Sequence, residues 1–301
     1  MLSIRRIEGF ISLIRPFTLL APIIVSICIM IASYTTSNNS LDGLLGVLPT
    51  IILASVSLAL LNAASNALNQ VTDVESDKIS KPYRPIPMGK ITIMEATVVS
   101  IILYLFSISI AWFINKVFFL ITLLIVVFTI TYSLPPRFKK TLFLNQLWVA
   151  LPRGFLGIIV SWSVFGDPLG FLPLTAATIA FFFLLGGSVT KDVKDCYADI
   201  LTGSRTLINT YGVEKSSFMV FPFLFTPFLF ILILIDMGLL DTLYWPLSLL
   251  VIPGFLVFYL MFLNKNNIGS RFENTPAWCL MYITYFLFAF GFSMISIMKV
   301  V

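Results

Sequence analysis

Long apolar runs dominate the chain and constrain its fold more than any other feature. About nine runs are long enough to cross a bilayer as helices, with approximate limits 17–37, 44–67, 96–114, 117–134, 144–165, 170–190, 217–235, 242–263 and 277–298. Of the 301 residues 58% are hydrophobic and 11% are charged, which excludes a water-soluble globular enzyme and a disordered chain. We therefore predict an all-α, polytopic membrane protein, with about nine transmembrane helices around a central cavity and a single domain over 1–301.

The basic residues fall almost entirely on one side of these spans. Sixteen of the 19 lie in the N-terminal arm or in the loops after spans two, four, six and eight. Only Lys116 and Lys299 lie on the other side, and Arg153 falls inside span five. Because basic loops stay in the cytoplasm, we predict a multi-pass plasma-membrane protein whose N-terminus and long loops, 69–95 and 191–215, are cytoplasmic. The amphipathic N-terminal arm is either an interfacial helix or an ordinary charged flank.

Two absences narrow the possible chemistry. The chain has no His, which excludes imidazole metal sites and Ser-His-Asp triads. Its three Cys are scattered and form no CxxC, so neither a disulfide framework nor a Cys-rich metal site is expected. Candidate sites must therefore be sought among the carboxylates and the basic residues.

Two short acidic motifs follow spans two and six. The first set is spaced i, i+4, i+8 and the second i, i+3, i+7: Asn69, Asp73 and Asp77, then Asp192, Asp195 and Asp199. On a helix that continues from its span, each set occupies one face. Oxygen ligands grouped in this way suit a hard cation, above all Mg²⁺, with substrate phosphates completing the shell. Carboxylates at the C-terminal end of a helix gain nothing from its dipole, so the arrangement is costly unless cations arrive.

The two faces together indicate a site for a metal-bound diphosphate. Opposed across a cavity, they could hold two or three Mg²⁺ ions around one diphosphate. Donors for the remaining phosphate oxygens stand nearby at Lys81, Arg84, Lys191 and Arg205. A single DxxxD at a helix end is usually a solvated surface, but two on the same side, each followed closely by Arg, favour the metal–diphosphate site.

Taken together, the motifs resemble those of the UbiA family of intramembrane prenyltransferases, over essentially the whole chain. That family carries NDxxDxxxD after its second helix and DxxDxxxD after its sixth; here 69–77 read NQVTDVESD and 192–199 read DVKDCYAD. KPYRPIPMGKIT at 81–92 and TYSLPPRFKK at 131–140 are similar to two further family segments. Gln70 departs from the common Asp. Because the face of Asn69, Asp73 and Asp77 survives, we expect activity to be kept, with the number or affinity of Mg²⁺ ions left open.

The resemblance implies Mg²⁺-dependent transfer of a polyprenyl group from its diphosphate to an acceptor. Asp73 and Asp192 are then the expected catalytic carboxylates. Tyr132 is the candidate ring beside the allylic carbocation, with an interfacial Tyr as its alternative role. The expected metal ligands are Asn69, Asp73, Asp77, Asp192, Asp195 and Asp199. The expected substrate-binding residues are Asn69, Lys81, Arg84, Arg137, Arg153, Lys191 and Arg205.

Arg153 stands among apolar residues beside Pro152. An Arg at mid-span costs at least about 2.5–3.5 kcal/mol, so it requires a reason. We expect it to contact an acidic acceptor or a carboxylate of the cavity. The alternative is snorkelling to the interface or a structural partner at a helix break.

The acceptor is left open, with an aromatic, quinone-type precursor favoured because GSRTL at 203–207 is similar to quinone-side relatives. The segment 81–92 is instead similar to the branch that uses geranylgeranylglyceryl phosphate in archaeal ether-lipid synthesis. An ion-coupled transporter is the alternative from another class, but its sites lie at the midplane, whereas these carboxylates lie at span ends. The expected partners are a polyprenyl diphosphate, a lipophilic or aromatic acceptor and the lipid bilayer, with no nucleic acid.

Overall fold

The computed structural model describes residues 4–38, 40–263 and 275–301, and within these ranges the ordered elements are all helical. The longer helices are α1 Ile4–Ile14, α2 Pro16–Asn38, α3 Leu44–Thr72, α5 Ile93–Ile114, α6 Lys116–Ser133, α9 Phe171–Gly187, α10 Asp192–Leu201, α11 Leu207–Asp236, α12 Val251–Leu263 and α13 Pro276–Met298. The shorter helical segments are α4 Val74–Ser80, η1 Phe138–Lys140, α7 Leu144–Ala150, η2 Leu151–Phe155, α8 Leu156–Trp162, η3 Ser188–Lys191 and η4 Thr242–Leu250.

Nine helical segments of the described chain are long and apolar enough to cross a membrane, which confirms the predicted fold class. Their limits differ from the predicted ones mainly at polar ends. Span two runs on to Thr72, span six to Leu201, and span seven begins at Leu207. An apolar run stops where polar residues begin, but the helix continues because its backbone hydrogen bonds do not depend on apolar side chains. Lys265 and Arg271, counted for the orientation, lie outside the described residues.

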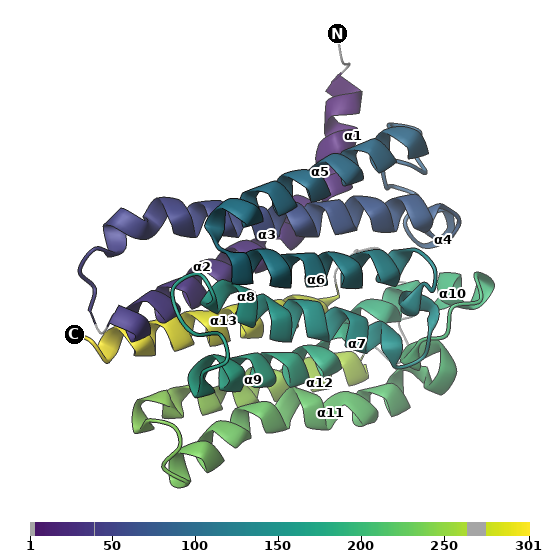
Figure 1. The fold of residues 1–301 in the computed structure, drawn as a ribbon. Helices are drawn as coiled ribbons and strands as arrows, with labels where there is room; N and C mark the ends of the chain where they lie inside the picture. The colour runs from purple at the N-terminus through teal and green to yellow at the C-terminus, as the bar shows by residue number, and fades with distance from the viewer. Residues whose placement is uncertain (1–3, 39, 264–274) are drawn as a thin grey trace.

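The spans lie side by side, and α4 and α10 are at the same end of the bundle in Figure 1. These two short helices carry the acidic motifs, so the fold brings together segments more than a hundred positions apart in the sequence. Along the lower edge of the view α11 and α12 pack together. The bundle therefore gathers the polar segments at one end while the apolar spans extend away from them.

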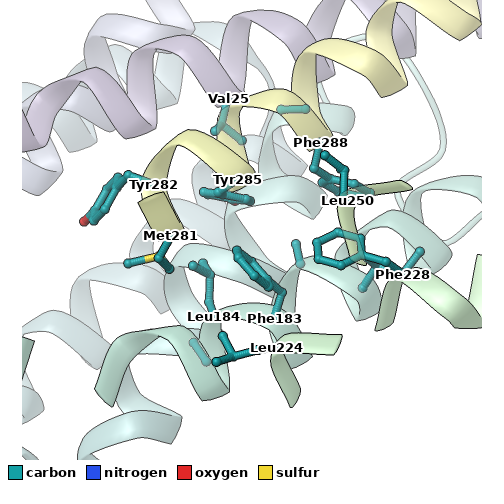
Figure 2. Close-up of a cluster of buried hydrophobic side chains, with 14 of the residues drawn as sticks. Val25, Phe183, Leu184, Leu224, Phe228, Leu250, Met281, Tyr282, Tyr285 and Phe288 are labelled. Atoms are coloured by element: carbon teal, nitrogen blue, oxygen red, sulfur yellow. The ribbon is translucent and has the colours of Figure 1, made fainter. Parts of the chain in front are cut away.

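Close helix packing is based on large aromatic residues and on small residues opposite them. Phe183 of α9 packs on Phe228 of α11 with ring centroids 5.1 Å apart, and Phe228 lies 6.2 Å from Phe288 of α13 (Figure 2). Gly186 faces α11 so closely that an added Cβ would lie 2.9 Å from Cβ of Phe223. Such contacts matter in a bilayer, where association depends on packing rather than on exclusion of water.

Helix α1 runs across the spans rather than along them (Figure 1). Its Gly9 and Leu13 are buried, while Ile4, Ile7 and Ile11 expose an apolar face. An exposed apolar face on a helix that crosses the spans fits the interfacial alternative better than an ordinary charged flank.

We predict that Lys78 and Lys116 lie on opposite sides of the membrane, because the basic bias and the span order require it. Single Lys78→Cys and Lys116→Cys variants should react with a membrane-impermeant maleimide from the cytoplasmic and the outer side, respectively. The parent chain is the control for its own three cysteines, of which Cys28 and Cys196 are buried and Cys279 is half-buried. Labelling of both variants from one side would contradict the orientation.

Candidate active site

A cavity of about 590 Å³ lies between the spans and is lined by both acidic motifs. Its walls deep in the bundle are apolar, for example at Val25, Leu58 and Leu184. Its charged lining consists of six acidic residues, Asp73, Glu75, Asp77, Asp192, Asp195 and Asp199, and eight basic ones, Arg15, Lys81, Arg84, Arg137, Lys139, Lys140, Arg153 and Lys191. The cavity thus joins a highly charged part to an apolar one, and its excess of basic residues favours an anionic ligand.

The first acidic motif does not lie on one uninterrupted helix, as the spacing predicted. Helix α3 ends at Thr72, Asp73 has φ −109° and ψ 16°, and α4 begins at Val74. The Thr72 hydroxyl donates to the Asn69 carbonyl at 3.1 Å and competes with the helical pattern there. Because the Asp77 N–H still donates to the Asp73 carbonyl at 2.7 Å, the interruption does not separate the motif residues.

The second motif is likewise displaced from the end of its span. A 3₁₀ turn, η3, separates α9 from α10, and Asp192 and Asp195 lie in the first turn of α10. Asp77 lies in the first turn of α4 in the same way. For Asp77, Asp192 and Asp195 the expectation that the carboxylates gain nothing from a helix dipole is therefore wrong, because a helix N-terminus favours negative charge. Asp199 lies near the C-terminal end of α10, where the expectation stands.

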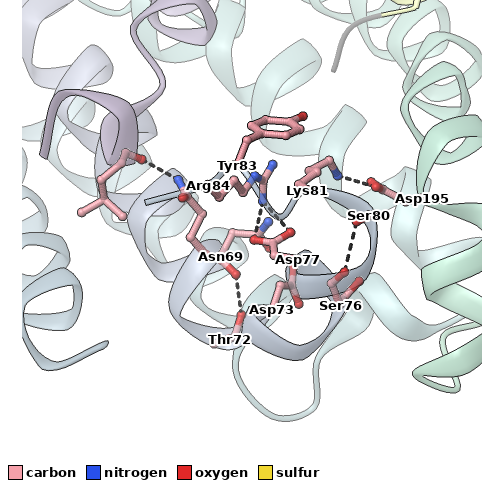
Figure 3. A network of polar contacts seen from close by, with 12 residues as sticks. Asn69, Thr72, Asp73, Ser76, Asp77, Ser80, Lys81, Tyr83, Arg84 and Asp195 are labelled. Carbon is pink, nitrogen blue, oxygen red and sulfur yellow. Dashed lines mark hydrogen bonds and ion pairs between the residues drawn. The ribbon is translucent and has the colours of Figure 1, made fainter. Parts of the chain in front are cut away.

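Ion pairs join the two motifs to the basic loop between α4 and α5 (Figure 3). Arg84 Nη1 donates to both Asp77 carboxylate oxygens at 2.9 and 2.7 Å, and both side chains are nearly fully buried. Lys81 pairs with Asp195 of the second motif. The loop after the first motif therefore contacts both acidic segments, and its basic side chains neutralise one carboxylate of each.

Asp73 and Asp192 have their own basic partners, whereas Asp199 forms no ion pair within the described part of the chain. Lys139 Nζ lies 2.7 Å from Asp73 and also donates to Asn69 Oδ1 at 2.9 Å. Lys191 Nζ lies 2.5 Å from Asp192. The mutual repulsion expected of an isolated carboxylate cluster is thus relieved by the chain itself.

Burial shifts the pKa values of two groups in this network that lie outside the spans. Burial raises the pKa of the Asp77 carboxyl, although the charges of Arg84 and Lys81 act in the opposite direction. Burial lowers the pKa of Lys139, and the carboxylate of Asp73 opposes that shift. In both cases the charged form depends on its partner, since desolvation alone would favour neutralisation.

Sequence reasoning missed three polar residues of this site. Asn145 Nδ2 and Gln146 Nε2 both donate to Asp192 Oδ2, at 3.0 and 3.2 Å, and Lys139 was counted only for orientation. The available signal was the polar pair Asn145–Gln146 at the start of an apolar run, where hydrocarbon-facing residues were expected. These amides hold the Asp192 carboxylate in place from α7.

Tyr132 and Arg137 both line the cavity. The Tyr132 hydroxyl donates to Asn145 Oδ1 at 3.1 Å, which fixes the ring beside the second motif. Arg137 has a left-handed backbone, with φ 58°, and its Nη2 donates to the Thr72 carbonyl at 2.6 Å. Its buried Nε has no hydrogen-bond partner within the described part of the chain, so one donor stays available to a ligand.

Two predicted substrate-binding residues, Arg205 and Arg153, lie away from the charged end of the cavity. Arg205 is exposed and is not among the residues that line the cavity, because the chain turns at Gly203, with φ 70°, before α11 begins. Arg153 does line the cavity, but from η2 inside span five, where its Nη1 donates to the Tyr282 hydroxyl at 3.1 Å.

Gln70 turns away from the site. It is buried, is absent from the cavity lining, and donates through Nε2 to the Leu13 carbonyl at 2.7 Å. Asn66, one turn earlier, donates to the Ile14 carbonyl at 3.0 Å. Position 70 therefore ties α3 to the end of α1, which explains why Gln can stand there while Asn69 and Asp73 still face the cavity.

The donor set suits a hard cation in kind, because carboxylate and amide oxygens from two elements line one cavity. In the described ranges, however, no three acidic or Cys side chains are already grouped as a ready-made metal site. Four motif carboxylates are instead held by Lys or Arg in the ion pairs described above: Asp73, Asp77, Asp192 and Asp195. Metal binding would therefore require these basic residues to exchange their partners.

Comparison with known proteins identifies what this fold and site resemble. The model of the UbiA prenyltransferase family matches residues 19–284. A digeranylgeranylglyceryl phosphate synthase of Saccharolobus solfataricus is 33% identical over 166 residues, 55% of this chain and 58% of the relative. That of Korarchaeum cryptofilum is 26% identical over 287 residues, 95% and 96% of the two chains. The solved UbiA homologue of Archaeoglobus fulgidus bound to GPP and Mg²⁺ has TM-score 0.74 at 20% identity, covering 97% of this chain and 99% of that one.

We predict that Arg84→Met destabilises the protein by about 3–5 kcal/mol, because it leaves the buried Asp77 charge without its partner. The change should appear as a lower apparent Tm of the purified protein in detergent. The double variant Asp77→Asn, Arg84→Met should recover part of the loss. Lys78→Met is the matched control, since Lys78 and Glu75 form an exposed pair that contributes little. Equal stability of Arg84→Met and Lys78→Met would contradict the prediction.

Proposed function

The chain belongs to the UbiA prenyltransferase family, and on that premise we propose that it transfers a polyprenyl group from its diphosphate to a lipid acceptor within the membrane. The observation that carries the proposal is a cavity that is lined by both acidic motifs and by basic residues at one end, and by apolar side chains together with Arg153 deeper in the bundle. A prenyl diphosphate needs both environments, because its head is a polyanion and its tail is a hydrocarbon.

The donor diphosphate lies at the charged end of the cavity in this proposal. Mg²⁺ held by the oxygens of the two motifs supplies neutralisation of the charge that develops on the leaving diphosphate. Asp73, Asp77, Asp192 and Asp195 would hold the metal jointly with the diphosphate, and Asn69 and Asp199 would complete the two faces. The lysines that pair with these carboxylates in the absence of substrate then donate to phosphate oxygens instead, as Lys81, Lys139 and Lys191 are placed to do.

The reaction breaks the allylic C–O bond, and the electron pair leaves with the diphosphate. The basic residues of the cavity stabilise the departing anion, and Arg137 adds its buried Nε donor. The ring of Tyr132, fixed by its bond to Asn145, stabilises the allylic cation through its face. The acceptor hydroxyl then adds to the cation through its oxygen, and its proton passes to the diphosphate.

The acceptor we propose is geranylgeranylglyceryl phosphate, the alternative of the sequence analysis rather than the aromatic precursor favoured there. The support comes from the names of the relatives, which are digeranylgeranylglyceryl phosphate synthases. Digeranylgeranylglyceryl phosphate that lacks one of its two geranylgeranyl groups is an anionic lipid with a free hydroxyl. That hydroxyl is the group that would accept the prenyl chain. Of the short segment 203–207 that favoured an aromatic acceptor, Ser204 and Thr206 line the cavity, but its charged residue, Arg205, does not.

We predict that Asp73→Asn and Asp192→Asn each lower kcat by on the order of 10²-fold, the scale of losing one preorganised electrostatic group. The measurement is transfer of labelled geranylgeranyl diphosphate at saturating Mg²⁺, and chelation with EDTA should abolish it in the parent. Asp167→Asn is the control, because Asp167 is exposed and lies away from the cavity. Near-normal, still Mg²⁺-dependent turnover in the Asp73→Asn, Asp192→Asn double variant would exclude the proposed mechanism.

We also predict that geranylgeranylglyceryl phosphate is a better acceptor than 4-hydroxybenzoate by at least about tenfold in kcat/KM, roughly 1.4 kcal/mol of transition-state discrimination. A panel of acceptors with one labelled donor measures this directly. Preferential prenylation of the aromatic acid would refute the acceptor while leaving the donor site of the proposal intact.

A further inference from the structure

Arg153 differs from the cations that bind the acidic motifs. Lys81, Arg84, Lys139 and Lys191 each pair with a carboxylate. In the part of the chain that the structure describes, Arg153 forms no ion pair, and its side chain bonds only a neutral partner, the Tyr282 hydroxyl, at 3.1 Å. A guanidinium inside a span, facing a cavity and lacking an anion, is an incomplete site.

Arg153 also lies deeper than the diphosphate end of the cavity. Asn145, which holds Asp192, stands eight residues earlier on the same span, so Arg153 is roughly 12 Å further along the helix axis. The segment around it is a π-turn, η2, a local helix form that is frequent at functional sites. A ligand at Arg153 would therefore be separate from the diphosphate.

The main chain at this position is held independently of the guanidinium. The Tyr285 hydroxyl donates to the Arg153 carbonyl at 3.0 Å, and Tyr285 is buried. Figure 2 shows Tyr282 at the edge of the buried cluster, with its hydroxyl directed away from it. The scaffold thus fixes one guanidinium and one hydroxyl toward the cavity, while the apolar cluster around Tyr285 supports them from behind.

We propose that Arg153 and Tyr282 form a second anion subsite, which binds the phosphate of the acceptor lipid. This inference rests on the proposed function and adds the place where the acceptor head group binds. A guanidinium offers two parallel N–H donors that match a phosphate, and a hydroxyl beside it can donate a third bond. The separation from the diphosphate site has a physical use, because two phosphorylated substrates held side by side would repel each other.

The test uses the purified full-length chain with Arg153→Gln, Arg153→Lys and Tyr282→Phe. Arg153→Gln should raise the KM for geranylgeranylglyceryl phosphate by at least about tenfold, the scale of one charge-assisted hydrogen bond, with the donor KM unchanged. Arg153→Lys should lie between Gln and the parent, and Tyr282→Phe should give a smaller rise. The matched control is Arg5→Gln, because Arg5 is exposed and does not line the main cavity.

A binding measurement separates this inference from the proposed function. Without donor, geranylgeranylglyceryl phosphate should raise the Tm of the parent more than the neutral geranylgeranylglycerol does, and Arg153→Gln should abolish that difference. A retained preference for the anionic lipid in Arg153→Gln, in binding or in KM, overturns the subsite. If the parent transfers no prenyl group to any acceptor, the proposed function fails, and the Tm difference still decides whether the anion subsite exists. If Arg153→Gln does not accumulate, the same Tm comparison is made with Arg153→Lys and Tyr282→Phe. Unchanged acceptor binding in both of these variants refutes the anion subsite.

Discussion

Pairing of each buried carboxylate with a basic residue is the interaction on which the site depends. Asp77 and Asp192 are buried beside one cavity inside a membrane protein, and without the counter-charges of Arg84 and Lys191 their burial would be prohibitively costly. Lys81 joins the loop after the first motif to Asp195 of the second, so the ion pairs also hold together segments that are distant in sequence. The same lysines and arginines are the groups that would donate hydrogen bonds to a diphosphate. The ion-pair network therefore already contains the donors that the substrate needs.

The membrane fold determines where the ion-pair network lies relative to the apolar part of the cavity. Spans with apolar outer faces enclose a cavity whose acidic residues lie at one end, where the short helices α4 and α10 follow the long helices α3 and α9, while Arg153 lines the cavity further along span five. Asn66 and Gln70 of α3 hold the end of α1 against α3, because their side-chain amides donate to the carbonyls at the end of α1. Gln70 faces away from the cavity, whereas Asn66, Asn69 and Asp73 of the same segment line it.

The two proposals assign different anions to different depths of one cavity. The charged end suits the diphosphate of the donor, while Arg153 suits the head group of an acceptor that carries its own phosphate. Between and around these two groups the apolar walls of the cavity suit the hydrocarbon chains of both substrates.

The sequence by itself determined the fold class, the number of spans and the positions of the two acidic motifs. Apolar length and charge alternation are local properties of the chain, and in a bilayer they leave few structures open. Only the tertiary structure decided which basic residue neutralises which carboxylate, that Asp73 interrupts its helix, that Arg205 lies outside the cavity and that Gln70 binds Leu13. These outcomes depend on helix rotation and on contacts between spans, which spacing along one helix cannot encode. Asn145 and Gln146 were missed for the same reason, since their partner Asp192 comes from another span.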